Sequence, residues 1–180
     1  MIILLALSLS GCGVNRLINT DYDLSSSNYV VFVLGIDSES EFTFLQNVGS
    51  DEEAKPAIYI QWRGKPQNGY IVGGSNTGIS TALLEATGTL CGGGKTIAFD
   101  APDSPKVIYL ADIKELTLSK VNQTTYQNIT HMELENNFEK ARSYIDENYP
   151  NLKGKLEPWP YKLVPTEACE INIHIPIILF

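Results

Sequence analysis

The sequence predicts a mainly β domain of the α+β class, in which an antiparallel sheet or a β-sandwich carries one amphipathic helix near residues 133–148. Two observations lead to this fold class. Short runs of β-branched and aromatic residues recur between turns rich in Gly, Pro and Asp, a pattern typical of strands. Only residues 133–148 convincingly repeat apolar side chains at three- and four-residue steps, which is the period of a helix packed on one side.

The first predicted strands lie within residues 29–45. Residues 29–34 form a continuous β-branched and aromatic run, which predicts a central strand covered on both faces. Residues 37–41 are polar and acidic, and residues 42–45 then alternate. We therefore expect the two runs to pair as a hairpin. The acidic segment indicates a solvated turn, because it lacks the glycine and the final glutamate of a calcium-binding loop.

The middle of the chain predicts further strands and hairpins. Residues 57–63 alternate, and residues 70–72 follow a Gly- and Pro-containing turn as the return strand. Residues 79–90 alternate poorly, and we interpret them as strand. Residues 96–99 and 106–113 flank a loop with two prolines, and prolines cannot join a central ladder. This arrangement predicts another hairpin.

Residues 91–96, with three glycines followed by Lys and Thr, invite comparison with a phosphate-binding loop. That loop needs a further glycine where this chain has Thr89, so we expect no nucleotide binding. The only histidines are His131 and His174, and neither lies in a Gly-x-Ser-x-Gly or His-Glu-x-x-His motif. We therefore expect no catalytic residue, no metal site, no cofactor and no enzyme activity.

The predicted helix begins near Glu133 and stops before Pro150. Thr130 and Glu133 have the spacing of a capping box, and a proline ends a helix at the residue before it. We expect its apolar stripe to lie on one face of the sheet. The stripe consists of Leu134, Phe138, Ala141, Ile145 and Tyr149.

Beyond the helix, Trp159 and Tyr161 stand among prolines, where neither can enter a regular ladder. A rigid aromatic loop can stack on a sugar or anchor a protein partner. The alternative is a lid packed over the sheet edge, and we favour the lid. Residues 170–175 alternate cleanly and predict a last strand.

At the N-terminus, the apolar residues 1–8 lead into Leu9-Ser10-Gly11-Cys12. This stretch resembles the lipobox of bacterial lipoproteins, although no Lys or Arg precedes the apolar run as a secretory signal would have. The resemblance implies that residues 1–11 are removed as a signal peptide and that Cys12 is lipidated. It also implies a lipid-anchored protein of the cell envelope, expected in the outer membrane and facing the periplasm or the cell surface.

The resemblance also sets the expected domain organisation. Residues 12–28 would be a lipidated tether and residues 29–180 a single β-rich globular domain. In the oxidising compartment that the lipobox implies, Cys91 and Cys169 are expected to form a disulfide, and two buried free thiols are the alternative. A net charge of −8 and a pI near 4.7 argue against nucleic-acid binding.

Residues 105–113 place a proline before a Val-x-Tyr-Leu-x-Asp-Ile strand, and this short stretch resembles small β-rich envelope lipoproteins of unknown function. From this likeness and the lipobox we expect a membrane-anchored, non-enzymatic interaction or structural module with an envelope protein as partner. One alternative is a module that binds glycan or another small ligand through Trp159 and Tyr161. The other is a small periplasmic hydrolase that uses a carboxylate pair.

Overall fold

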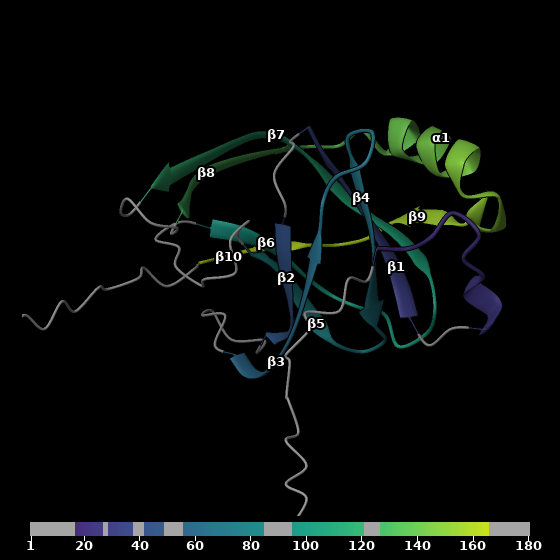
Figure 1. Cartoon of the computed structure of the whole chain (residues 1–180), viewed down its shortest axis with the longest axis horizontal. Coiled ribbons are helices and arrows are strands. Elements are labelled where there is room, and N and C mark those ends of the chain that lie inside the picture. The colour runs from purple at the N-terminus through teal and green to yellow at the C-terminus, as the bar shows by residue number, and fades with distance from the viewer. Residues whose placement is uncertain are drawn as a thin grey trace, which may run out of the picture.

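The structure is a computed structural model that describes residues 17–26, 29–37, 42–48, 56–84, 95–120 and 127–165. Within these ranges the chain forms two five-stranded sheets that pack on each other and one α-helix that covers the first sheet (Figure 1). The predicted fold class, mainly β with one packed helix, is confirmed. No helix in these ranges has the length and apolar character needed to span a membrane.

The first sheet has the strand order β4-β1-β7-β8, and β9 pairs with the first part of β7. Its pairs are antiparallel except β1 with β7 and β7 with β9, which are parallel. The long strand β7 therefore pairs with β1 along one edge. Along its other edge, it pairs first with β9 and then with β8. The strands of this sheet are β1 (Tyr29–Ile36), β4 (Tyr70–Asn76), β7 (Val107–Lys120), β8 (Gln127–Glu135) and β9 (Leu156–Pro158).

The second sheet is antiparallel throughout and has the order β10-β6-β5-β2-β3. Its strands are β2 (Phe42–Val48), β3 (Pro56–Gly64), β5 (Ser80–Leu84), β6 (Lys95–Asp100) and β10 (Lys162–Pro165). Short 3-10 turns, η1 (Leu24–Ser26) and η2 (Pro150–Leu152), lie before β1 and after the helix.

Strand β1 is central and covered on both faces, as its apolar run predicts. Phe32 and Leu34 belong to the core between the sheets, whereas Val31 and Val33 belong to the core under the helix. All four side chains are fully buried. Because successive residues of a strand point to opposite faces, an uninterrupted apolar sequence is what a strand between two apolar layers requires.

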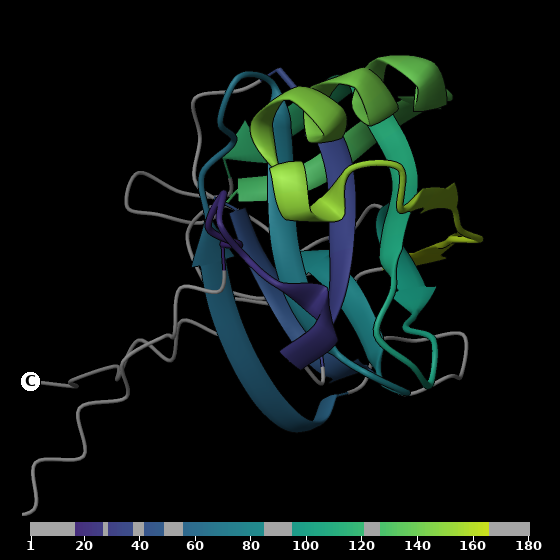
Figure 2. The same cartoon turned by 90° about the vertical axis from the view of Figure 1, so that its right-hand side faces the viewer.

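The helix α1 (Phe138–Asn148) lies across the outer face of the first sheet, with the second sheet on the other side (Figure 2). Its Ala141 and Ile145 pack against β1, β4 and β7, as expected from the apolar stripe. The helix starts later than predicted, because Glu133 lies in β8 and so cannot form a capping box with Thr130. The Phe138 N–H group instead bonds to the Asn136 side chain at 3.1 Å. The helix does end before Pro150, as predicted.

Three predicted hairpins are wrong, because the chain changes sheet where a return strand was expected. β1 and β2, β3 and β4, and β6 and β7 are each split between the two sheets. The antiparallel neighbours that follow each other in the chain are β2 with β3, β5 with β6, and β7 with β8. Period-2 alternation shows which side of a strand is apolar, and both sheets of a sandwich offer such a side.

Residues 17–24, which the sequence assigns to the tether, lie on the first sheet. Leu17 bridges Gly73 of β4, and the Ile18 N–H group donates to the Val72 oxygen at 3.0 Å. Ile18, Tyr22 and Leu24 pack against the core under the helix. Outside the described residues lie Cys12, Cys91, Cys169, residues 1–11 and residues 170–175.

Candidate functional site

Trp159 connects the two sheets. Its backbone N–H group donates to the backbone carbonyl oxygen of Tyr109 at 2.9 Å, and its indole Nε1–H donates to the backbone carbonyl oxygen of Asp100 at 2.8 Å. The ring is half-buried against the core between the sheets, and the Lys106 ammonium lies 5.4 Å from its centre. Tyr161 is 39% exposed. The surroundings of Trp159 are those of a lid packed on the sandwich, while Tyr161 lies at the surface.

A row of residues crosses the first sheet at the N-terminal end of α1. Tyr70 of β4 pairs with Gly35 of β1, Gly35 pairs with Asp112 of β7, and Asp112 pairs with Glu135 of β8. The pairing of β1 with β7 shifts register between Val33 and Gly35. Such a shift re-aims side chains. The shift places the carboxylate of Asp112 in this row, beside the start of the helix.

The Asp112 carboxylate is buried and held by hydrogen bonds. The Tyr109 hydroxyl donates to its Oδ1 at 2.9 Å, and the Asn137 Nδ2 donates to its Oδ2 at 3.2 Å. The Tyr109 hydroxyl in turn accepts the Asn137 backbone N–H at 2.9 Å. Burial raises the pKa of Tyr109, and the Asp112 charge adds to this rise. A buried carboxylate needs such partners, so these contacts fix the start of α1 on the sheet.

Tyr70 lies next to this network under the helix. Its ring stacks on Tyr144 of α1 at a centroid distance of 4.4 Å. Its hydroxyl is buried and has no hydrogen-bond partner among the described residues. Burial, with a contribution from the Asp112 charge, raises the pKa of Tyr70 to about 12. Unlike Tyr109, Tyr70 buries a hydroxyl group that makes no hydrogen bond with any described residue.

A hollow of about 380 Å³ opens above Asp112. Both signs of charge line it, because β8 and the chain after β1 supply carboxylates while β7 and the first turn of α1 supply ammonium groups. None of its described lining residues is Ser, Thr, Cys or His. The hollow therefore suits recognition of a charged group, and its described lining offers no hydroxyl, thiol or imidazole nucleophile. Its charged lining residues are Asp37, Asp112, Lys114, Glu135 and Lys140.

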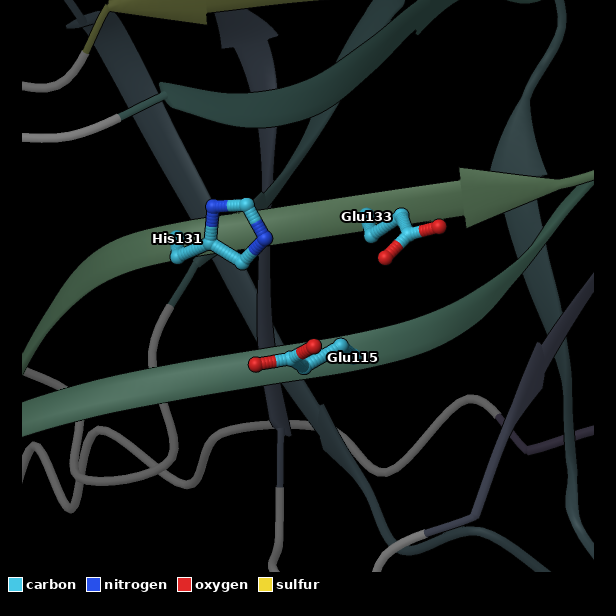
Figure 3. Close-up of side chains that lie close together, drawn as sticks. All are labelled: Glu115, His131 and Glu133. Carbon is cyan, nitrogen blue, oxygen red and sulfur yellow. The ribbon is translucent and has the colours of Figure 1, made fainter.

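A second polar cluster lies on the β7–β8 hairpin, where Glu115, His131 and Glu133 gather on one side (Figure 3). Glu115 pairs directly with Glu133 across the ladder, and His131 lies two residues before Glu133 on β8. One potential ligand atom from each residue lies within 4.8 Å of the others. The Lys114 ammonium donates to Glu133 Oε1 at 2.6 Å, and this contact holds the pKa of Glu133 below its ordinary value.

Sequence reasoning missed this cluster because it assigned Glu133 to a helix. On a helix, residues two apart point in different directions, whereas on a strand they share a face. The sequence feature that could have revealed the strand is the alternation of residues 131–135. There His131, Glu133 and Glu135 are separated by Met132 and Leu134. Met132 and Leu134 pack against the core between the sheets, so the polar residues face the other way.

No hydrogen-bond or ring contact joins Trp159 to the hollow or to the hairpin cluster among the described residues. Trp159 therefore lies apart from the other two features, which share Lys114: this residue lines the hollow and donates to Glu133 of the cluster. Comparison with protein-family models, with curated proteins and with solved structures finds no match for this chain.

Proposed function

We propose that this chain is a lipid-anchored, non-enzymatic interaction module of the bacterial cell envelope, and that the hollow at the start of α1 receives an envelope protein partner. The lipobox residues ending in Cys12 support the anchor. One observation supports the docking site: a charged hollow built over a carboxylate whose position is fixed.

The charges around the hollow define the chemistry of the partner. Asp37 and Glu135 can accept hydrogen bonds from an arginine or lysine side chain, whereas Lys140 can pair with a carboxylate. Asp112 is only 7% exposed and already accepts two hydrogen bonds. The partner is therefore a protein surface that presents neighbouring basic and acidic side chains, and Asp112 supports the floor of the hollow.

The same contacts favour recognition over hydrolysis. A glycoside-cleaving pair needs one free carboxylate and one carboxylic acid next to the substrate. Here Asn137 Nδ2 donates to both Asp112 Oδ2 and Glu135 Oε1, the latter at 2.6 Å. The two acids are thus engaged with the same amide, in the manner of a structural contact.

Partner capture with charge-reversed variants tests the docking site. Full-length lipidated protein is cross-linked in intact cells and purified, and the co-purified envelope proteins are quantified. We expect Lys140→Glu to reduce recovery of a specific partner at least tenfold. Lys153→Glu is the matched control, because it makes the same charge change at an exposed lysine outside the hollow. Equal recovery by the two variants would show that the hollow is not the docking site.

Mass spectrometry of the native protein tests the anchor independently. We expect a chain that begins at Cys12 and carries a diacylglyceryl thioether there. A chain with residues 1–11 intact and an unmodified sulfur at Cys12 would remove the membrane part of the proposal. Partner capture would still decide the role of the hollow.

The alternative function is binding of glycan or another small ligand at Trp159 and Tyr161. The exposure of Tyr161 supports it, whereas the indole contact with Asp100 opposes a free stacking surface at Trp159. Titration with a panel of oligosaccharides, followed by tryptophan fluorescence, separates the two functions. Saturable quenching that Tyr161→Ala abolishes would support this alternative, and the absence of quenching would exclude glycans as its ligands.

A further inference from the structure

We propose that Glu115, His131 and Glu133 form a binding site for a divalent transition-metal ion of the zinc class on the β7–β8 hairpin (Figure 3). This inference does not depend on the proposed docking hollow. It rests on an imidazole and two carboxylates that two neighbouring strands bring together, and on the unfavourable charge that this arrangement creates.

The strand geometry explains why the three groups meet. His131 and Glu133 are two residues apart on β8 and share a face, while Glu115 is the cross-strand partner of Glu133. Register shifts lie on both sides of Glu115, one between Ile113 and Glu115 and the other between Thr117 and Leu118. β-Bulges of this kind recur where a strand re-aims a side chain. The apolar neighbours of His131 and Glu133 point into the core, so the three groups face away from the second sheet.

Two carboxylates at this position face each other across the ladder, which does not favour the pairing of β7 with β8. Like charges directly opposite each other on a ladder are destabilising, and Glu115 faces Glu133 in this way. Lys114 pairs with Glu133 at 2.6 Å and also attracts Glu115 electrostatically, but no described residue lies within ion-pair distance of Glu115. A cation bound between the two carboxylates would offset their repulsion and use the imidazole as a third ligand.

The ligand types select the class of metal. Imidazole nitrogen and carboxylate oxygen suit zinc and its neighbours, whereas calcium and magnesium prefer oxygen ligands alone. Zinc binds such atoms at about 2.0–2.2 Å, so the three side chains must rotate inward from their present separation. Solvent exposure leaves them room to do so, and the Glu133 side chain is 45% exposed although Lys114 holds it. Water would complete the coordination sphere.

Lys114 is the residue that gives this proposal a distinctive test. Its ammonium occupies one oxygen of Glu133, so an incoming cation must compete with it. Removing the ammonium should therefore tighten metal binding, although it breaks an ion pair of the folded protein. A purely structural role for the cluster predicts no effect of this variant on metal affinity.

Isothermal titration of the full-length protein in detergent with zinc chloride measures the affinity. We expect one ion per chain, at least tenfold weaker binding for His131→Ala and about threefold to tenfold weaker binding for Glu115→Gln. For Lys114→Met we expect at least threefold tighter binding. Magnesium chloride should give no saturable heat. Far-UV circular dichroism of each variant checks that the strands are retained.

Two control variants make the result specific. His174→Ala removes the only other histidine of the chain and should leave the zinc affinity unchanged. Glu157→Gln breaks an equivalent ion pair, since Glu157 of β9 accepts from Lys106, the residue before β7, at 2.6 Å. It should also leave the zinc affinity unchanged. The spectrum of bound cobalt ion gives a second readout, whose visible bands should be lost in His131→Ala.

Several results would overturn the proposal. Zinc affinity unchanged by His131→Ala, or reduced equally by His174→Ala, would place the ion elsewhere. Magnesium binding as strong as zinc binding would indicate general attraction to acidic side chains. Zinc affinity that is unchanged or lowered in Lys114→Met would show that Glu133 is not a ligand.

Discussion

The carboxylate of Asp112 occupies the space that a side chain at Gly35 would need. A Cβ atom at Gly35 would overlap Oδ1 of Asp112 and lie 2.9 Å from Oδ2. We therefore expect Gly35→Ala to lower the free energy of unfolding by about 2–3 kcal/mol, because overpacking forces neighbouring groups to shift. Urea denaturation followed by tryptophan fluorescence measures this loss.

A double-mutant cycle identifies the cause. In Asp112→Ala the space beside Gly35 is open, so Gly35→Ala should cost much less there than in the native chain. Gly69→Ala is the control, since Gly69 lines the same hollow but has open space around it and a φ of 80°. Its backbone strain should not depend on Asp112. Equal costs of Gly35→Ala in both backgrounds would refute the steric explanation.

Tyr109 and Tyr70 should respond oppositely to the loss of their hydroxyl groups. Tyr109→Phe removes the donor to Asp112 and the acceptor of the Asn137 N–H, so we expect a loss of about 2 kcal/mol in the free energy of unfolding. Tyr70→Phe removes a buried hydroxyl that has no partner among the described residues. It should be neutral or stabilising by up to about 1 kcal/mol. Equal losses in the two variants would contradict the hydrogen-bond pattern.

Stability should fall steeply above pH 10. The pKa of Tyr70 is raised to about 12, and burial also raises the pKa values of Tyr109 and Tyr149. The unfolded chain loses phenolic protons near pH 10, while these folded tyrosines keep theirs. Each contributes full stability below pH 10 and loses it at about 1.4 kcal/mol per pH unit as the pH rises towards its folded pKa.

Urea midpoints between pH 9 and pH 12, with phenolate absorbance, check this pH dependence. Tyr70→Phe should make the fall of the unfolding free energy with pH shallower by about 1.4 kcal/mol per pH unit, the contribution of one tyrosine. Titration of all nine tyrosines in one step near pH 10, without loss of structure, would contradict the prediction.

Trp159 and Tyr161 should differ in their effect on stability. Trp159→Ala removes the indole contact with Asp100 and packing against the core between the sheets, and we expect a loss of about 2–3 kcal/mol. Tyr161→Ala changes an exposed ring and should cost less than about 0.5 kcal/mol. Thermal unfolding by circular dichroism compares them. Equal stabilities of both variants would argue against a structural lid at Trp159.

The sequence predicted elements better than pairings. Residues 29–34 and 106–113 are apolar enough to identify buried strands, and both lie in the centre of the first sheet. The partners of these strands depend on which of the two sheets the next strand joins. The alternation of apolar and polar residues does not contain this information. The stripe from Phe138 to Ile145 likewise identified the helix. A strand was expected over residues 124–129, but the last residues of β8 were assigned to the helix because Thr130 and Glu133 have capping-box spacing.

The candidate sites were harder to predict for a related reason. Asp112 stands in an apolar strand, and only the register shift near Gly35 turns it towards the helix. The Glu115 and Glu133 pairing needs the ladder between β7 and β8. Trp159, in contrast, was expected as a packed lid from its flanking prolines, and its contacts are those of a lid.

The parallel pairing of β1 with β7 has a consequence for the order of assembly. Val31 meets Val107 in this pair, so a chain that emerges from its N-terminus presents the first strand long before its partner arrives. The first sheet cannot close until most of the polypeptide is free, and such distant pairings form slowly. For a precursor that crosses a membrane in extended form, as the proposed lipid anchor requires, this late closure keeps the chain unfolded during its passage.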